Sequence, residues 1–170
     1  IKADYRAIAN THHISENLAK LVVNRGVRSN EELKKYLTAN IEDMYNPEEM
    51  EGVSAAIELL LKKITEHKKI RIVGDYDVDG VISVYLLKTA LDRCKANVDY
   101  IIPDRIKDGY GINLSIIEAA HKEQVDTIIT CDNGIAAIEQ IAYAKSLGIT
   151  VIITDHHDIS YREEDGQRHY

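Results

Sequence analysis

The chain has 170 residues, of which 45% are hydrophobic and 29% are charged, so it can bury the core of one domain. No segment approaches the roughly 20 apolar residues that a membrane-spanning helix needs, and two cysteines, Cys94 and Cys131, are too few for a disulfide scaffold. The formal net charge of −7 argues against a surface built mainly to coat nucleic-acid backbones, and we expect a reducing, cytoplasmic setting.

The first part of the chain is predicted to be helical. Ser15 and Ser29 precede helix-forming segments and are typical N-cap residues, and Glu32 follows Ser29 at the spacing of a capping box. We expect residues 1–69 to form a helical N-terminal region that packs on the core. Its last helix is indicated by apolar residues at helical spacing, which are Ile57, Leu60, Leu61 and Ile64.

From residue 70 onward, strand and helix patterns alternate. Short runs rich in β-branched residues predict strands at Ile70–Val73, Val98–Ile102, Thr127–Thr130 and Thr150–Thr154. Apolar residues three and four positions apart predict helices at Val81–Arg93, Leu114–Lys122 and Ala136–Leu147. Such alternation with short connections implies right-handed crossovers. The predicted fold is therefore α/β, with a parallel sheet covered by helices on both faces.

Acids and histidines directly follow several of these predicted strands. Ligands bind outside the carboxyl ends of parallel strands, and closely spaced carboxylates repel one another unless a cation lies among them. Carboxylates combined with imidazoles suit manganese, magnesium or zinc, and acids that can be shared favour a pair of ions. The sequence thus predicts a metal site built from Asp75, Asp77 and Asp79 after the first strand, Asp132 after the third, and Asp155, His156 and His157 after the fourth.

Acids at this spacing also occur in proteins of other classes. The pattern D-x-D-x-D-G opens the EF-hand calcium loop, but the twelfth position counted from Asp75 is Leu86, where that loop needs a glutamate. A phospho-receiver domain gathers acids at a similar sheet edge but does not need the paired histidines. A solvated acidic turn would account for the first cluster alone. Cys131 adjoins the predicted site, and we interpret it as a small buried residue.

A further candidate segment follows the second predicted strand, and it contains Arg105 and the turn Gly109-Tyr110-Gly111. It lies at the same predicted edge of the sheet as the acids. Arginine can grip phosphate with two parallel donors, and glycine permits close backbone approach. We expect this segment to contact substrate phosphate. Stacking of Tyr110 on a base is a second hypothesis, and ordinary turn chemistry is the alternative.

The order of these motifs resembles a known family. GDYDVDGV begins at Gly74, PDR at Pro103, GYG at Gly109, DNGI at Asp132 and TDHH at Thr154. The chain resembles the DHH phosphoesterase superfamily and, within it, the RecJ branch of single-strand-specific exonucleases. The segment LVVNRG, residues 21–26, resembles the part of RecJ proteins that precedes their catalytic core.

This resemblance implies a 5′→3′ exonuclease that hydrolyses single-stranded DNA with two manganese or magnesium ions, in recombination and repair. By position, Asp77 would hold the first ion, Asp79 and His156 the second, and Asp132 would bridge them. It also implies that residues 70–170 are a DHH domain truncated at its C-terminal side. A DHHA1 domain and a nucleic-acid-binding domain would follow in the parent chain.

The resemblance assigns roles to the remaining site residues as well. Asp155 would orient the ring of His156, and His157 would touch the scissile phosphate. Many members of the superfamily place a metal-binding histidine four residues before the middle aspartate. Here that position is Val73, so we expect Asp75 to substitute for it in part as a further metal ligand.

Three functional hypotheses follow. The leading one is the catalytic-core fragment of a RecJ-type exonuclease, with the isolated fragment inactive or weakly active. The second is a DHH phosphodiesterase or phosphatase that acts on oligonucleotides, cyclic dinucleotides or small phosphates. The third is a catalytically dead DHH scaffold, which the complete set of candidate ligands disfavours.

Overall fold

The structure is a computed structural model that describes residues 4–27, 29–159, 162–164 and 167–169. It contains two compact units, Ile1–Glu51 and Gly52–Tyr170, and each is considered by itself below. Within the described residues, no helix combines the length and the apolar character that crossing a membrane requires.

The first unit consists of short helices, as predicted. Its α-helices are α1 (Tyr5–His12), α2 (Glu16–Asn24) and α3 (Asn30–Thr38), and 3-10 turns follow at Ile41–Asp43 and Pro47–Glu49. The predicted caps are confirmed. Ser15 Oγ accepts from the Leu18 amide at 3.2 Å, and the Ser29 and Glu32 side chains each accept from the other residue's amide. The two caps satisfy backbone donors that the first turn of a helix leaves free.

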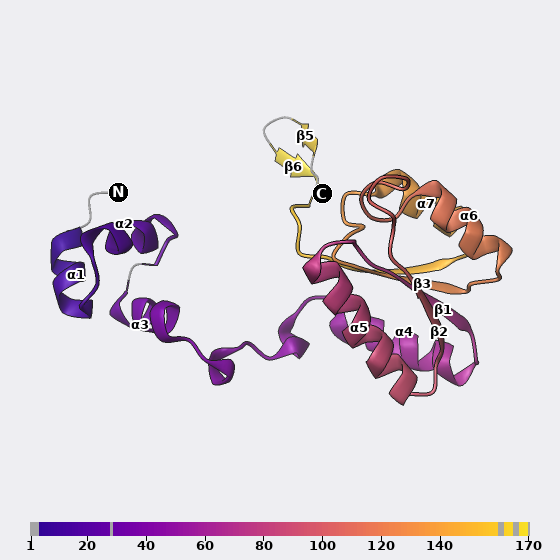
Figure 1. The fold of residues 1–170 in the computed structure, drawn as a ribbon, viewed down its shortest axis with the longest axis horizontal. Helices are drawn as coiled ribbons and strands as arrows, with labels where there is room; N and C mark the ends of the chain where they lie inside the picture. The colour runs from indigo at the N-terminus through magenta and orange to yellow at the C-terminus, as the bar shows by residue number, and fades with distance from the viewer. Residues whose placement is uncertain (1–3, 28, 160–161, 165–166, 170) are drawn as a thin grey trace. The chain divides into compact units, whose positions relative to one another are not determined.

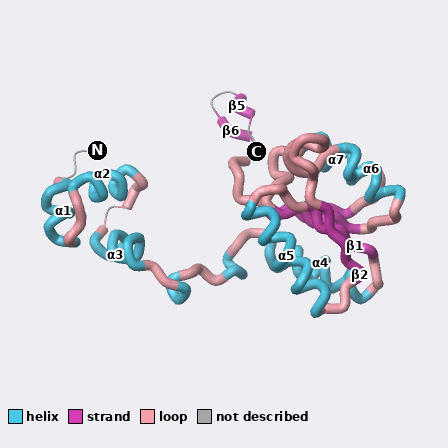
Figure 2. Tube along the Cα trace, viewed as in Figure 1, coloured by secondary structure: helices cyan, strands magenta, loops and turns pink. Residues whose placement is uncertain are grey.

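The second unit holds the predicted parallel sheet. Its strand order is β2-β1-β3-β4, and each neighbouring pair is parallel (Figures 1 and 2). The strands and helices fall close to the sequence-based ranges, which confirms the α/β fold. They are α4 (Val53–Thr65), β1 (Lys69–Val73), α5 (Val78–Arg93), β2 (Asn97–Ile101), α6 (Leu114–Lys122), β3 (Thr127–Cys131), α7 (Ile138–Ser146) and β4 (Thr150–Thr154).

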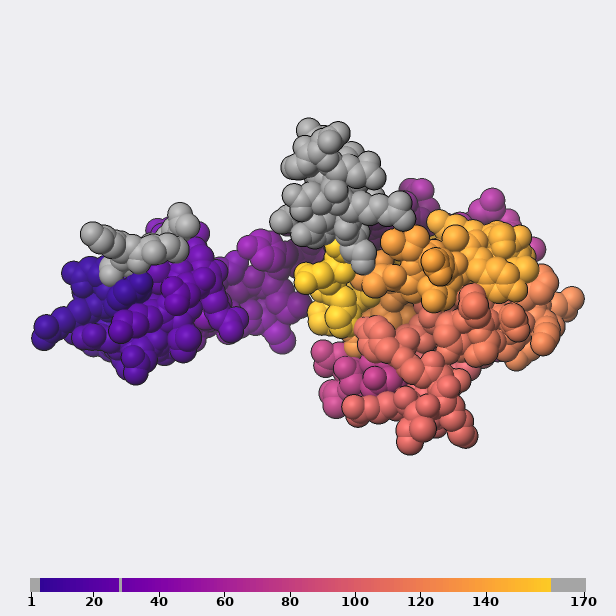
Figure 3. Space-filling view, turned by 90° about the horizontal axis from the view of Figure 1, so that it is seen from above, coloured from indigo at the N-terminus to yellow at the C-terminus, as the bar shows by residue number. Residues whose placement is uncertain are grey.

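Helices cover both faces of this sheet (Figure 1). On one face, α6 and α7 lie next to each other (Figure 3). Ile117 of α6 and Ala144 of α7 share one buried core with Ile128 of β3. On the other face, Val84 of α5 packs against Ile72 of β1. Both cores consist mainly of buried aliphatic side chains, which hold the strands in one register and so fix where their carboxyl ends meet.

Helix α4 belongs to the sheet-bearing unit, although its sequence pattern placed it with the helices before it. Its inner face also differs from the predicted stripe. Leu60 and Ile64 pack on the core as expected, whereas Ile57 and Leu61 are 49% and 57% exposed. The helix contains more apolar positions than one face can bury, and spacing alone does not show which of them turn inward. The inner face is completed by Ala56 and Leu59.

An ion-pair network centred on the buried Arg71 lies beside β1. The Arg71 guanidinium, whose side chain is 8% exposed, donates to both carboxylate oxygens of Asp99 at 2.7 Å and to Glu123 at 2.6 Å. These bonds join β1, β2 and the end of α6. Burial alone would raise the pKa of Asp99, but the hydrogen bonds and charge of Arg71 outweigh it and lower that pKa.

After β4, the short strands β5 (Arg162–Glu164) and β6 (Gln167–His169) pair antiparallel as a separate sheet. The sequence pattern predicts no strands there. Alternating polarity is too weak a signal in a run of three polar residues to identify a strand.

Candidate metal centre

The loop from β1 into α5 places two of the predicted acids. Asp77 is the N-cap of α5, and its carboxylate accepts from the Gly80 amide at 3.1 Å. This bond is the main reason that the pKa of Asp77 is lowered. A Cβ on Gly80 would lie 2.5 Å from the backbone oxygen of Asp75, so only glycine allows this close turn. The turn leaves Asp75 1% exposed below the exposed Asp77.

The residues after β3 are held by the side chain of Asn133. This fully buried amide donates to the backbone oxygens of Val73 at 3.0 Å and Cys131 at 2.9 Å, and it accepts from the Ile112 amide at 3.1 Å. It therefore connects the ends of β1 and β3 to the loop before α6. Asp132, immediately before it, has the left-handed backbone conformation, with φ of 63°.

The residues after β4 are organised by Asp155, whose side chain is 2% exposed. Its Oδ1 accepts from the amides of His156 and His157 at 2.8 and 3.1 Å and lies 2.7 Å from Nδ1 of His157. Its Oδ2 accepts from the Ile135 amide at 3.0 Å. Burial would raise the pKa of Asp155, but these bonds outweigh it and lower the pKa. The ring that Asp155 contacts is that of His157, whereas the resemblance implied His156.

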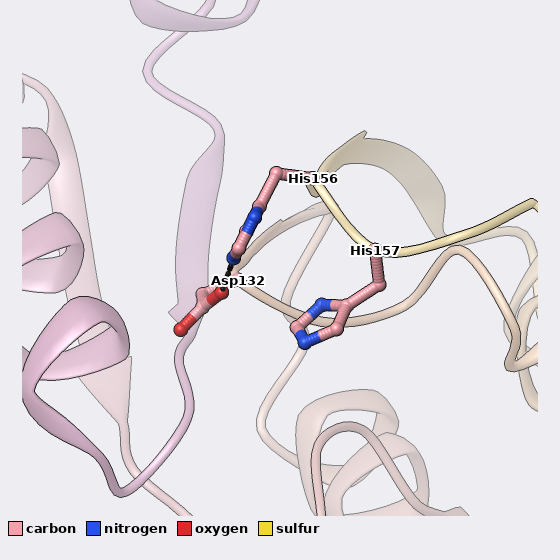
Figure 4. A group of neighbouring side chains, drawn as sticks. All are labelled: Asp132, His156 and His157. Atoms are coloured by element: carbon pink, nitrogen blue, oxygen red, sulfur yellow. Dashed lines mark ion pairs between the residues drawn. The ribbon is translucent and has the colours of Figure 1, made fainter. Parts of the chain in front are cut away.

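The three strand ends bring the candidate ligands into two groups that share one acid. One ligand atom each from Asp75, Asp77 and Asp132 lie within 4.8 Å of one another, and the same holds for Asp132, His156 and His157 (Figure 4). Nε2 of His156 lies 2.9 Å from Oδ1 of Asp132. Asp132 thus occupies the position that a shared ligand would need.

The predicted ligand Asp79 lies in the first turn of α5 and is exposed. It joins neither of these groups among the residues that the structure describes. Asp75, which the sequence predicted only as a partial substitute for a histidine ligand, does join one of the two ligand groups.

The charge balance of the site favours a cation. Burial raises the pKa of Asp132, and repulsion from Asp77 adds to the shift. Oδ1 of Asp75 and Oδ1 of Asp132 are buried and accept no hydrogen bond, although Nε2 of His156 lies 2.9 Å from the latter. Buried carboxylate oxygens without partners are costly, and a divalent ion would satisfy both. Carboxylate oxygens with imidazole fit manganese, magnesium or zinc.

The loop between β2 and α6 brings the phosphate-contact candidates to the same edge. The Arg105 guanidinium lies 5.4 Å from the ring centre of Tyr76, and the Tyr76 ring packs edge-on against Tyr110 at 6.4 Å. The Tyr110 hydroxyl donates to the backbone oxygen of Asp132 at 2.8 Å and lies 3.2 Å from Nδ1 of His157. Burial and the surrounding carboxylates raise the pKa of Tyr110 to about 12. Arg105 and Tyr110 are therefore joined to the metal-ligand candidates through contacts that the sequence does not reveal.

A pocket of about 330 Å³ adjoins this arrangement, between the Gly109–Gly111 turn and the start of α7. His157 and Asp155 line one side of it, and Ile135, Ala137 and Gln140 are among the residues that line the rest. Sequence reasoning missed this pocket, because its walls come from three loops.

Cys131 is buried, as interpreted from the sequence, and burial raises the pKa of its thiol to about 11.

Comparisons with known proteins agree with this geometry. Residues 69–169 match the model of the DHH family, N-terminal domain. The chain is 41% identical over 146 residues to the single-stranded-DNA-specific exonuclease RecJ of Bacillus subtilis, and 38% identical over 141 residues to that of Escherichia coli. These matches cover 86% and 82% of this chain but 19% and 24% of the relatives, so the chain spans about a fifth to a quarter of their length.

Solved structures show the same similarity. A crystal structure of exonuclease RecJ bound to manganese matches with a TM-score of 0.61 and 33% identity, over 65% of this chain and 29% of that one. RecJ from Thermus thermophilus in complex with Mn²⁺ also gives a TM-score of 0.61, with 26% identity over 92% of this chain and 21% of that one. The fold, the grouped acids and histidines, and the match over residues 69–169 together show that this chain belongs to the DHH family.

Proposed function

We propose that this chain is the catalytic DHH portion of a metal-dependent exonuclease that removes nucleotides from single-stranded DNA in the 5′→3′ direction. The observation that supports this most directly is the pair of ligand groups that share Asp132. Two ions that share a carboxylate suit in-line attack on phosphorus. The relatives named as single-stranded-DNA-specific exonucleases supply the substrate class.

The ligand roles in this proposal follow the structure where it is specific. Asp77 would hold one manganese or magnesium ion together with Asp75, His156 would contribute to the second, and Asp132 would be shared. Asp79 is assigned to the second ion by its place in the motif. When bound, the ions lower the pKa of a coordinated water molecule and stabilise negative charge on phosphate oxygens.

The protein groups around the ligands orient the substrate. His157 is 48% exposed and lies beside the ligand groups, so its ring can reach a phosphate oxygen. In the metal-free chain, the hydrogen bond to Asp155 raises the pKa of His157. Arg105, exposed and stacked on Tyr76, adds a cation on the same edge. We assign His157 and Arg105 to phosphate binding.

We further propose that the parent protein contains DHHA1 and nucleic-acid-binding domains, because the matched region is only 19% and 24% of the length of the two relatives. We also propose that the parent protein is cytoplasmic. On this proposal the present chain alone hydrolyses DNA weakly or not at all. A catalytically dead scaffold is disfavoured, because the structure retains both ligand groups.

The test compares substrates in a protein of the relatives' full length that carries this sequence. It should degrade long 5′-labelled single-stranded DNA in Mn²⁺ or Mg²⁺, lose this activity in EDTA, and leave duplex DNA intact. Faster hydrolysis of a dinucleotide than of long single-stranded DNA would replace the exonuclease with a DHH phosphodiesterase of short substrates. Activity that survives chelation would refute the metal dependence.

A further inference from the structure

The hydroxyl of Tyr110 makes contacts that no substrate role requires. It donates its proton to the backbone oxygen of Asp132 at 2.8 Å, and its oxygen faces the His157 ring, 3.2 Å from Nδ1 and 3.4 Å from Nε2. The Tyr110 and His157 rings meet edge to face, with their centres 5.8 Å apart. One hydroxyl thus connects the residue that both ligand groups share with the histidine that we assign to phosphate.

The turn that carries Tyr110 is shaped for this contact. Gly109 and Gly111 both have left-handed backbones, with φ of 76° and 64°. A Cβ on Gly111 would lie 3.0 Å from Cβ of Asn133, so the turn sits directly against that buried side chain. Asn133 in turn accepts from the Ile112 amide at 3.1 Å. The backbone of the turn is therefore fixed to the ends of β1 and β3, and the bond to Asp132 holds the hydroxyl of the half-exposed Tyr110.

His157 is contacted from two sides. Oδ1 of Asp155 lies 2.7 Å from its Nδ1, and the Tyr110 oxygen lies near the same nitrogen. A single contact at Nδ1 leaves the ring free to swing about that bond, whereas two contacts from different loops define its plane. Because the side chain of His157 is 48% exposed, packing alone does not hold it.

From this geometry we propose that Tyr110 is a positioning residue, which holds the His157 ring and the Asp132 backbone in a fixed relation. This inference rests on the proposed function, since it concerns the same site, and it revises the expectation that Tyr110 acts by contacting substrate phosphate. The hydroxyl proton is already donated to Asp132, so it is not available to a phosphate oxygen.

The test uses this chain without metal or nucleic acid, and compares it with its Tyr110→Phe variant. That substitution removes one oxygen and keeps the ring. Imidazole ¹⁵N–¹H NMR reports each histidine, and His157→Gln identifies the His157 signals. His67 and His121, which lie in a different pocket from His157, serve as internal references. Tyr100→Phe is the matched control, because Tyr100 is 56% exposed in β2.

We expect Tyr110→Phe to shift and broaden the His157 signals and to leave the signals of His67 and His121 unchanged. The melting temperature should fall by only about 2–4 °C, which is what the loss of one hydrogen bond causes. A general loss of structure would also move the signals of His67 and His121. Mn²⁺ titration should show binding about 10-fold weaker than that of the unaltered chain, which is the usual effect of losing a group that supports a ligand. Tyr100→Phe should match the unaltered chain in both measurements.

The proposal is overturned if the His157 signals of Tyr110→Phe coincide with those of the unaltered chain, or if Mn²⁺ binds both proteins equally well. If the unaltered chain binds no Mn²⁺, that result contradicts the proposed metal site and leaves the proposed role of Tyr110 to be decided by NMR. The His157 signals, measured without metal, then decide the role of Tyr110 on their own.

Discussion

Replacement of Asp132 by asparagine should stabilise the metal-free protein and remove most of its response to metal. The side chain is 5% exposed, its Oδ1 has no hydrogen-bond partner, and burial and Asp77 raise its pKa. A neutral amide removes the buried charge and its repulsion from Asp77, and it gives up part of the attraction of His156. Because one pKa unit corresponds to about 1.4 kcal/mol, we expect Asp132→Asn to gain about 1 kcal/mol. For a chain of this length this is a rise in Tm of about 3 °C.

The response to Mn²⁺ should change in the opposite direction. At an Mn²⁺ concentration of about 100 times Kd, binding stabilises the unaltered chain by about 2.7 kcal/mol. Loss of the shared carboxylate should weaken binding at least about 100-fold, since loss of a supporting group alone costs about 10- to 100-fold. The same Mn²⁺ concentration then stabilises the variant by only about 0.4 kcal/mol.

Differential scanning calorimetry with and without Mn²⁺ measures both effects, and the order of the two melting temperatures should reverse when metal is added. Glu118→Gln, which removes one exposed negative charge from α6, is the control for net charge. A lower metal-free Tm for Asp132→Asn would show that the carboxylate is structural. An undiminished Mn²⁺ response would refute its role as a shared ligand.

Three further predictions concern the same unit. In a full-length protein that carries this sequence, Asp132→Ala should reduce exonuclease turnover at least about 1000-fold, whereas His12→Ala should reduce it less than about twofold; near-normal turnover of the former would reject the two-ion assignment. Because Arg71 lowers the pKa of Asp99, the ion pair should stabilise the fold fully above the unfolded-state pKa of about 3.9, and this stabilisation should be lost as pH falls through the lower folded-state pKa. Arg71→Met should flatten this part of the curve of stability against pH, measured by acid-induced unfolding followed by circular dichroism. Gly80→Ala should lower stability by about 2–4 kcal/mol in urea unfolding, because its Cβ would meet backbone 2.5 Å away, and a loss below about 0.5 kcal/mol would contradict that turn geometry.

The sequence predicts the sheet well because its signals are local. The runs at Ile70–Val73 and Thr150–Thr154 are β-branched and short, and the structure places strands within one residue of both. The convergence of Asp77, Asp132 and His156 at one edge also follows from topology, since parallel strands present their carboxyl ends together. What the sequence cannot supply is the face of a helix that turns inward. In α4 the exposure of Ile57 and Leu61 depends on how the helix packs against the sheet, and the spacing of the apolar residues does not predict it.

The finer arrangement of the site depends on backbone conformations that residue type does not predict. Asp132 has positive φ, which is uncommon for a residue other than glycine, and the buried Asn133 beside it is held by bonds to three separate segments. In that conformation the backbone oxygen of Asp132 accepts from Tyr110 while its carboxylate lies with the metal-ligand candidates. The motif predicts Asp132 as a metal ligand, but only the folded chain shows that its backbone oxygen also accepts from Tyr110 in the loop between β2 and α6. A substitution in the Gly109–Gly111 turn should therefore affect metal binding even though no residue of that turn belongs to either ligand group.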